Sequence, residues 1–352
     1  MKNISCIAIS LILISLTSCN GCNKNKSREK PDVSNIKADV HLLRFDQDLF
    51  LLKENNFKEH QELMKKKYGA FYNFYVDQFI VGPRQAGDTA NIEEEAVKRF
   101  VTDGYIQRLQ DSINLHFADT KGLEEELTQS FKYFKYHFPE ATIPQVITVN
   151  SGFSLGAFTY DKDILGIGLD LYLGGNNPDY DSAGVYEYVQ HKMSSDYIAR
   201  NSMEVLYNSY FSNEELSRQK NLIEAIVDQG KKLYFLSYVL PDAPDSLILG
   251  FTQKQTDWCE KSEYEIWKFM NDKDLLYKSN FMDQKRYLDE GPTTSGMPAE
   301  SPGTIGNWIG LQVVRKFMKE SGNKISLHDL VVRYDGKTIF EKAKYRPSKS
   351  VF

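Results

Sequence analysis

The stretch QVITVNSGFSLGAFTYDKDILGIGLDLYL, residues 145–173, decides the fold class of this chain. Its first six residues are rich in β-branched side chains and predict a strand, and residues 151–156 carry the small residues of a turn. Further strands are predicted at 157–160 and 164–173, and Asp161-Lys162-Asp163 between them is typical of a hairpin tip. We therefore expect a small antiparallel sheet in the middle of the chain.

Segments with helical patterns flank the predicted sheet on both sides. Apolar residues recur there at spacings of three and four, which is the repeat of one face of an α-helix. The predicted helices are 56–81, 93–116 and 123–136 before the sheet, and 186–212, 214–240, 252–271 and 305–321 after it. Asp335-Gly336 predicts a last turn, between short strands at 331–334 and 339–340. The prediction is an α+β fold, mainly helical with a small antiparallel sheet, in one globular domain at 39–352.

The first residues are predicted to direct the chain to a membrane. Lys2 precedes an apolar run at 4–16 that is too short to span a bilayer, and the run closes with Leu16-Thr17-Ser18-Cys19, the lipobox pattern of bacterial lipoproteins. We expect residues 1–18 to be removed as a signal peptide. Cys19 would then carry diacylglycerol on its thiol and an acyl chain such as palmitate on its new amine, which together anchor a protein stably. An ordinary signal peptide would require no cysteine at this position.

Composition and cysteine content limit the kinds of partner and the disulfides that are expected for this chain. Hydrophobic residues make up 41% of the chain and aromatic residues 13%, which is enough for a large core. The net charge of −5 becomes −6 once Lys2 is removed, so no nucleic-acid partner is indicated. Residues 19–38 are predicted to be a flexible, basic tether. Cys22 lies in this tether and Cys259 in the domain; they either form a disulfide, or Cys259 is free and buried.

No intact catalytic or metal-binding motif is present. Zinc proteases carry His-Glu-x-x-His on one helix, which puts two imidazoles on one face beside the Glu that activates water. No two histidines of this chain are four residues apart; they stand at 41, 60, 116, 137, 191 and 328. Glu187 and His191 have that spacing on a predicted helix, and either bind a metal weakly or form an ordinary solvated contact. Gly166-Ile167-Gly168 lies inside a predicted strand, so close backbone packing is expected rather than a dinucleotide loop.

Three motifs in one order resemble the gliding motility lipoprotein GldB family of Bacteroidota. They are Gly166-Ile167-Gly168-Leu169-Asp170-Leu171-Tyr172-Leu173-Gly174, then Gln229-Gly230-Lys231-Lys232-Leu233-Tyr234-Phe235 with the nearby Leu240-Pro241, and then Ser301-Pro302-Gly303-Thr304-Ile305-Gly306-Asn307-Trp308-Ile309-Gly310-Leu311-Gln312-Val313-Val314-Arg315. Together with the lipobox, the resemblance covers nearly the whole mature chain.

That family looks like a remote relative of zinc-dependent proteases, so the resemblance implies a zincin-like, metallopeptidase-like scaffold. The first zinc motif would fall at residues 203–207, where Met203 and Tyr207 replace the imidazoles and Glu204 is kept. The ligand Glu of the second motif would fall at Gln229. Three lost ligands leave nothing to hold zinc, and without zinc no bound water is activated. The resemblance thus implies a pseudo-protease without metal, cofactor or catalytic residue, in which Glu204 is a structural carboxylate beside Arg200.

The leading hypothesis is therefore a non-catalytic envelope protein that binds a protein partner of the gliding motility or type IX secretion apparatus, or of a related envelope assembly. A peptide could add to an edge strand near 166–173. The alternative is a metal-dependent peptidase or hydrolase with non-standard ligands, drawn from His191, Glu187 and Glu204. Surface-export signals of such lipoproteins are acidic after the cysteine, whereas this tether is basic. We therefore expect a lipid anchor in the outer membrane, with the domain facing the periplasm.

Overall fold

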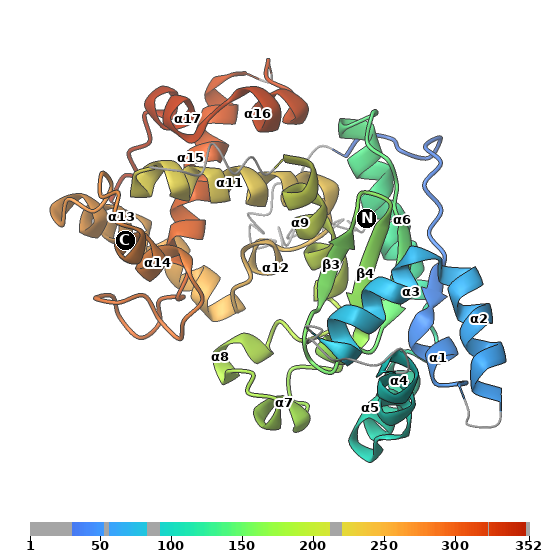
Figure 1. Ribbon diagram of the computed structural model, residues 1–352. Coiled ribbons are helices and arrows are strands. Elements are labelled where there is room, and N and C mark those ends of the chain that lie inside the picture. The colour runs from blue at the N-terminus through green and yellow to red at the C-terminus, as the bar shows by residue number, and fades with distance from the viewer. Residues whose placement is uncertain (1–29, 53–55, 83–91, 212–219, 323, 350–352) are drawn as a thin grey trace, which may run out of the picture. The chain divides into compact units, whose positions relative to one another are not determined.

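The fold is built around a mixed sheet of four strands. The computed structural model describes residues 30–52, 56–82, 92–211, 220–322 and 324–349. Strands β1 (Leu42–Arg44), β2 (Gln145–Val149), β4 (Ile164–Gly168) and β3 (Ala157–Tyr160) follow one another across the sheet in that order (Figure 1). Both β1 and β4 run parallel to β2, and β3 runs antiparallel to β4.

The α+β class is confirmed, but the prediction of an antiparallel sheet is wrong. The hairpin of β3 and β4 forms as expected across its tip at 161–163. Because β4 then inserts between β2 and β3, it pairs with β2 in parallel. The three-residue β1 joins β2 from about a hundred residues earlier in the chain, and so short a strand leaves no alternating pattern to recognise.

The segment predicted as a strand at 164–173 divides in two. Strand β4 ends at Gly168, and the 3-10 helix η3 (Leu169–Tyr172) follows, with the buried Asp170 in its first turn. Since β4 has neighbours on both sides, the expected addition of a peptide to an edge strand here is wrong. The close packing expected of Gly166 and Gly168 is confirmed. A Cβ atom on Gly166 would lie 2.2 Å from the Phe158 ring, and one on Gly168 would lie 2.0 Å from the Leu155 carbonyl oxygen.

Two of the three helices predicted before the sheet, 56–81 and 93–116, are divided, and the helix predicted at 123–136 forms. The helices of this part are α1 (Phe45–Leu49), α2 (Phe57–Tyr68), α3 (Ala70–Tyr75), the π-helix η2 (Val76–Val81), α4 (Ile92–Thr102), α5 (Gly104–His116) and α6 (Lys121–His137). Gly69, at φ +55°, separates α2 from α3. Asp103 separates α4 from α5, because its carboxylate accepts hydrogen bonds from the backbone N–H groups of Tyr105 and Ile106.

The helices after the sheet include two where strands were predicted. They are α7 (Asp179–Ser182), α8 (Glu187–Gln190), α9 (Tyr197–Phe211), α11 (Leu222–Val239), α12 (Asp245–Leu249), α13 (Gln253–Asp272), α14 (Phe281–Leu288), α15 (Ile305–Glu320), α16 (Leu327–Arg333) and α17 (Gly336–Ala343). The predicted strand pair at 331–340 is wrong because Asp335-Gly336 is not a hairpin turn. Asp335 is instead the N-cap of α17, accepting from the Thr338 N–H.

The sheet separates two hydrophobic clusters. Neighbouring residues of a strand point to opposite faces, so Ile147 and Val149 of β2 join a cluster with α1–α4 while Val146 joins a larger cluster on the other face. The smaller cluster is aromatic: the Phe45 ring lies edge-on to Tyr68 at a centroid distance of 4.8 Å. The larger cluster draws on α5, α6, α9, α11 and the helices that follow. The larger cluster is therefore built mainly from the C-terminal half of the chain.

Helix α11 packs against α15 through glycines. A Cβ atom on Gly230 would lie 2.2 Å from the Gly310 carbonyl, and one on Gly310 would lie 2.0 Å from the Ile226 oxygen. A Cβ atom on Gly306, one turn before Gly310, would lie 2.8 Å from residues of α14 and 3.0 Å from Ile226. Two motifs that carried the family resemblance, around Gly230 and around Gly310, thus meet at the contact where these two helices approach most closely.

Several predicted features lie at or beyond the limits of the described residues. The signal peptide at 1–18, Cys19 and Cys22 fall outside them. The compact unit begins at Pro31, and Val33 and Ala38, within the predicted tether, are buried. Cys259 of α13 is a free and fully buried thiol. Among the helices that the structure describes, none has the length and hydropathy of a membrane-spanning segment.

The glycine contact predicts that a Gly→Ala substitution at this position destabilises the protein, which is opposite to the usual effect in a helix. In an exposed helix interior, Gly→Ala stabilises by roughly 1 kcal/mol. Gly310→Ala should instead lower the free energy of unfolding by roughly 2–3 kcal/mol, because α15 must move away from α11 to admit the methyl group. Urea denaturation of the purified protein measures the change. Gly122→Ala in α6, where no atom lies within 4 Å of the added carbon, is the control and should be neutral or stabilising.

Candidate functional site

The predicted former metal site falls where α9 lies against α11. Glu204 of α9 accepts a hydrogen bond from Arg200, one turn earlier, and its other carboxylate oxygen lies 2.6 Å from Lys232 Nζ of α11. Burial by itself raises the pKa of Glu204, but Arg200 and Lys232 together outweigh burial and lower this pKa to about 2. At neutral pH the carboxylate is therefore ionised and neutralised by two cations, including the Arg200 expected beside it.

The two positions predicted to have lost imidazoles are occupied by packed side chains. Met203 is fully buried in the larger cluster. The Tyr207 ring lies 5.3 Å from Phe211 and 5.1 Å from Phe235 of α11, measured between ring centroids. Burial, and secondarily the charge of Asp228, raises the pKa of Tyr207, so its hydroxyl stays protonated. Neither residue presents a ligand atom to an open site.

Gln229, the fourth residue of the predicted former metal site, lies on α11. It is half-buried on α11, three residues before Lys232. In the described part of the chain, no recorded hydrogen bond connects its side chain with Met203 or Tyr207, and none of these residues lines either of the two cavities described below. The structure thus brings Met203, Glu204 and Tyr207 against α11, the helix that carries Gln229.

The residues of the alternative ligand set lie on different elements. The helix predicted at 186–212 is divided, so that Glu187 starts the single-turn α8 and is exposed, while Glu204 lies on α9. His191 Nε2 lies 3.3 Å from the Gly250 carbonyl oxygen, and burial lowers the pKa of His191. Among residues that the structure describes, no three His, Cys, Asp or Glu side chains are grouped so as to hold a metal ion.

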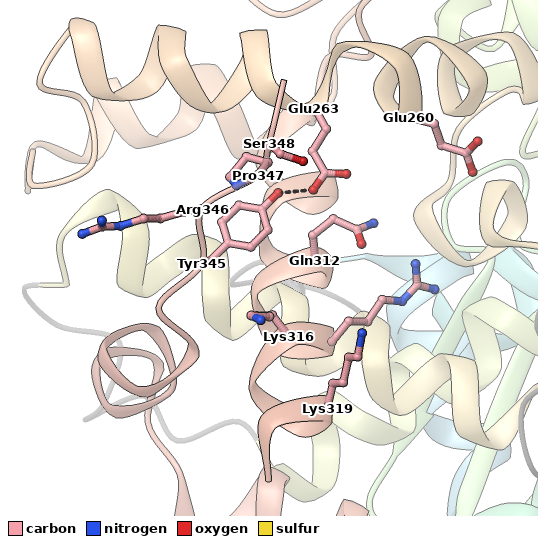
Figure 2. Close-up of a pocket in the computed structure, with 10 residues that line it drawn as sticks. Glu260, Glu263, Gln312, Lys316, Lys319, Tyr345, Arg346, Pro347 and Ser348 are labelled. Carbon is pink, nitrogen blue, oxygen red and sulfur yellow. Dashed lines mark hydrogen bonds between the residues drawn. The ribbon is translucent and has the colours of Figure 1, made fainter. Parts of the chain in front are cut away.

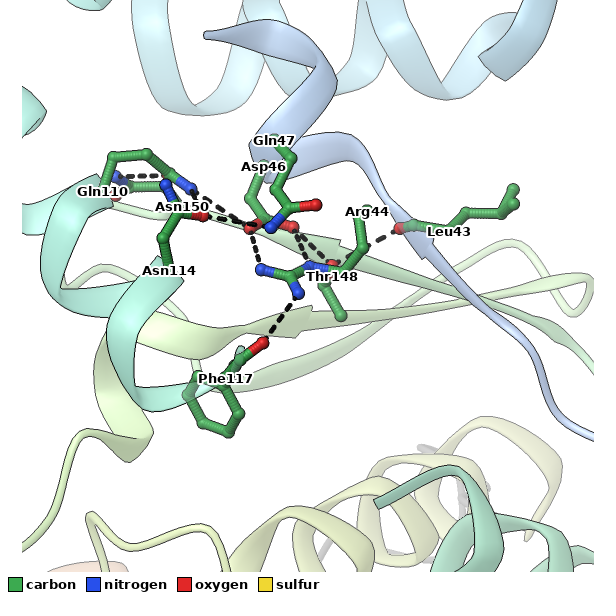
Figure 3. Close-up of polar contacts among 9 residues, drawn as sticks. All are labelled: Leu43, Arg44, Asp46, Gln47, Gln110, Asn114, Phe117, Thr148 and Asn150. Atoms are coloured by element: carbon green, nitrogen blue, oxygen red, sulfur yellow. Dashed lines mark hydrogen bonds and ion pairs between the residues drawn. The ribbon is translucent and has the colours of Figure 1, made fainter. Parts of the chain in front are cut away.

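A polar cluster that the sequence did not reveal lies at the carboxyl ends of the parallel strands. We call it the strand-end cluster, and it comprises Arg44, Asp46, Gln110, Thr148 and Asn150 (Figure 3). Ligands of open α/β sheets bind at this edge, which makes the cluster a place to look for function. The signals available in the sequence were Asn150 directly after β2 and Asp46 two residues after β1, but β1 itself was not predicted.

Asp46 is the centre of the strand-end cluster and is completely buried. Arg44 donates to both of its carboxylate oxygens, from Nε at 3.0 Å and from Nη2 at 2.8 Å. Thr148 Oγ1 donates to Asp46 at 2.5 Å, and Gln110 Nε2 donates at 3.2 Å. Arg44 uses its remaining Nη1 to reach the Phe117 carbonyl at 3.0 Å. The carboxylate therefore has four protein donors.

A second buried carboxylate, Asp170, holds the turn that follows β2. It accepts from the Ser151 N–H and hydroxyl, both at 2.8 Å, and from the Phe153 N–H at 2.5 Å. These bonds hold Gly152 and Phe153 at φ +61° and +63°, a conformation that is rare for a residue with a side chain. Burial raises the pKa of Asp170, against the opposing effect of its hydrogen bonds.

The strand-end cluster and Asp170 are connected and hold neighbouring parts of the chain together. The Ser151 hydroxyl donates to Asp170 and accepts from the N–H groups of Ser154 and Leu155, so all of its hydrogen bonds lie within the turn after β2. Asn150 links the two carboxylates, through Gln110 on one side and through its peptide bond to Ser151 on the other. The arrangement fixes strand ends and a turn, which is a structural role.

A cavity of about 490 Å³ lies between α13, α15 and the C-terminal segment 345–348 (Figure 2). The Tyr345 hydroxyl points to Glu263 and donates to its Oε1 at 2.6 Å, and burial raises the pKa of Glu263. Arg315, which also lines the cavity, is ion-paired with Asp245 at 2.7 Å. The Tyr345 hydrogen bond therefore joins the C-terminal segment to α13, and the Arg315–Asp245 ion pair joins α15 to α12.

The Glu204 ion pairs predict a dependence of stability on pH. The folded-state pKa of about 2 lies below the ordinary 4.5, so this contribution is fully present above pH 4.5 and is lost as the pH falls toward 2. Glu204→Gln should lower the free energy of unfolding by roughly 2 kcal/mol at pH 7, allowing for a side chain that is 23% exposed, and by much less near pH 2. Denaturation at several pH values measures this difference. Glu125→Gln, exposed on α6, should show no such dependence.

The strand-end cluster predicts a larger loss. Asp46→Asn leaves Arg44 without a counter-charge in a buried site and should cost about 3 kcal/mol of unfolding free energy. Urea denaturation at pH 7 measures it, beside Asp111→Asn, which changes an exposed carboxylate on the same helix as Gln110. An Asp46→Asn protein as stable as the Asp111→Asn protein would show that the buried pair does not hold the strand ends.

Most of the sequence matches a protein-family model. The model described as gliding motility protein GldB matches residues 26–347. No curated protein and no solved structure matches the chain.

Proposed function

This chain belongs to the gliding motility protein GldB family, and from that membership we propose that it is a non-catalytic, lipid-anchored envelope component of the gliding machinery that binds a protein partner. The observation that carries the proposal is the match itself, which spans residues 26–347 and so includes every element of the described domain up to the C-terminal segment.

The contacts of Glu204 support the non-catalytic part of the proposal. A zinc site at this position would need imidazoles at 203 and 207 and a carboxylate free to activate water. Met203 and Tyr207 pack in the larger cluster, and the carboxylate of Glu204 is occupied by Arg200 and Lys232. We infer that, if the family descends from a zincin-like scaffold, this chain has replaced the metal by an ion-paired helix contact.

The anchor part of the proposal rests on the lipobox. Cys19 follows an apolar segment and precedes a basic tether. Acyl chains on Cys19 would confine the domain near membrane partners and raise their effective concentration without any added contact. A tether without acidic residues directly after the cysteine favours an outer-membrane position facing the periplasm.

Complementation of the native host tests this proposal. A strain that lacks the gene should not spread, and the wild-type gene should restore spreading. Cys19→Ala behind a cleavable signal peptide should not restore it at equal protein level, because the soluble domain is no longer concentrated at the membrane. Colony spreading and single-cell movement are the measurements.

Cys22→Ser is the matched control, since it changes a neighbouring cysteine and keeps the lipobox. Full movement of cells that carry only the soluble domain would rule out a role for the anchor. Stoichiometric zinc in the purified wild-type protein, lost in His191→Ala, would contradict the non-catalytic assignment.

A further inference from the structure

A second cavity, of about 360 Å³, opens beside α6 and the segment that joins α11 to α12. Its apolar lining includes Tyr133 of α6, and Leu240, Pro241 and Leu247. The Leu240-Pro241 pair contributed to the family resemblance, and neither the strand-end cluster nor the Glu204 ion pairs involve it. A volume at the low end of the range for ligand pockets, roughly 300–1,000 Å³, suits a few side chains of an extended segment rather than a folded surface.

Three carboxylates also line this cavity, and no basic side chain does: Glu126, Asp196 and Asp242. All three belong to exposed residues, whereas Leu240 is 6% exposed. Negative charge therefore surrounds the opening and apolar atoms lie deeper. We call this cavity, with its three carboxylates and its apolar lining, the acidic-rimmed pocket.

Glu126 and Asp196 of the acidic-rimmed pocket differ from the carboxylates that hold the fold together. Asp46 and Glu204 face cations of the same chain. For Glu126 and Asp196, no ion pair is recorded within the described residues. Burial, and then the charge of Asp196, raises the pKa of Glu126, which means that the two carboxylates repel each other. A cation placed between them would remove this repulsion.

We propose that the acidic-rimmed pocket binds a peptide segment of a partner protein in which an aliphatic residue adjoins lysine or arginine. The aliphatic side chain contacts Leu240 and Pro241, and the cation lies between Glu126 and Asp196. Lysine and arginine suit this position because their methylene stems cover apolar surface while the charged group stays at the opening. The inference rests on the proposed function, since it specifies the kind of partner that the domain binds.

The test uses a defined probe, the acetylated and amidated peptide Gly-Leu-Lys-Leu-Lys-Gly, and its counterpart with glutamate in place of lysine. The lysine peptide should bind the purified protein saturably, and the glutamate peptide should not. The double variant Glu126→Gln/Asp196→Asn should weaken binding of the lysine peptide at least tenfold, as measured by titration calorimetry or NMR. It should unfold no more easily than wild type, because two repelling charges are removed.

A matched double variant separates the pocket from the general negative charge of the protein. Glu125→Gln/Asp111→Asn removes the same number of charges from exposed residues that do not line the pocket, and it should leave binding unchanged. Absence of saturable binding to wild type would overturn the inference. Equal weakening by both double variants would also overturn it, since simple charge attraction would then explain the binding.

The same variants in the native host distinguish this inference from the proposed function. Glu126→Gln/Asp196→Asn, produced at wild-type level, should reduce spreading, and Glu125→Gln/Asp111→Asn should not. If the strain that lacks the gene spreads normally, the proposed function fails. If that strain does not spread but the Glu126→Gln/Asp196→Asn strain does so fully, only the acidic-rimmed pocket fails.

Discussion

Helix α11 can occupy its position only because glycines let α15 approach it at backbone distance. Gly230 and Gly310 face each other at this crossing, with Gly306 one turn away. From there α11 contacts α6, α9, α12, α14, α16 and α17, so most of the larger cluster is arranged around it. The position of Lys232 against Glu204, and the course of the segment around Leu240 and Pro241, both follow from where α11 lies.

The buried polar groups have a different role, because they fix the ends of strands and a turn, whereas the hydrophobic clusters form the cores. Asp46 fixes the end of β1 to β2, and Asp170 fixes the turn after β2 to the end of β4. Both carboxylates are satisfied by protein donors, and the same holds for Glu204 between two helices. A buried charge is tolerated only with such partners. Glu126 and Asp196 are exposed, so water solvates their charges and no partner within the chain is required.

Features encoded by residues close together in the sequence were predicted correctly. Features that depend on contacts between distant residues were not. The helical repeats and the β3–β4 hairpin could be predicted because neighbours in sequence encode them. The parallel pairing of β1 depends on residues a hundred positions apart, and Asp335-Gly336 fits a turn and a helix start equally well. For the site, the Arg200–Glu204 contact follows from a helical spacing of four. Lys232 and the acidic-rimmed pocket depend on how separate helices pack, which no spacing reveals.

The parallel register of β1 also determines how mechanical load enters the domain. Before β1 the chain passes through residues 31–41, in which Val33, Ala38 and Val40 are already buried, and β1 is the first strand of the sheet that tension on the N-terminal side reaches. Resistance at β1 comes from three paired positions and from the Arg44–Asp46 ion pair, which Thr148 joins to β2. The buried ion pair thus holds the first strand to the rest of the sheet. For a family associated with movement, the strength of this contact is as relevant as any binding site.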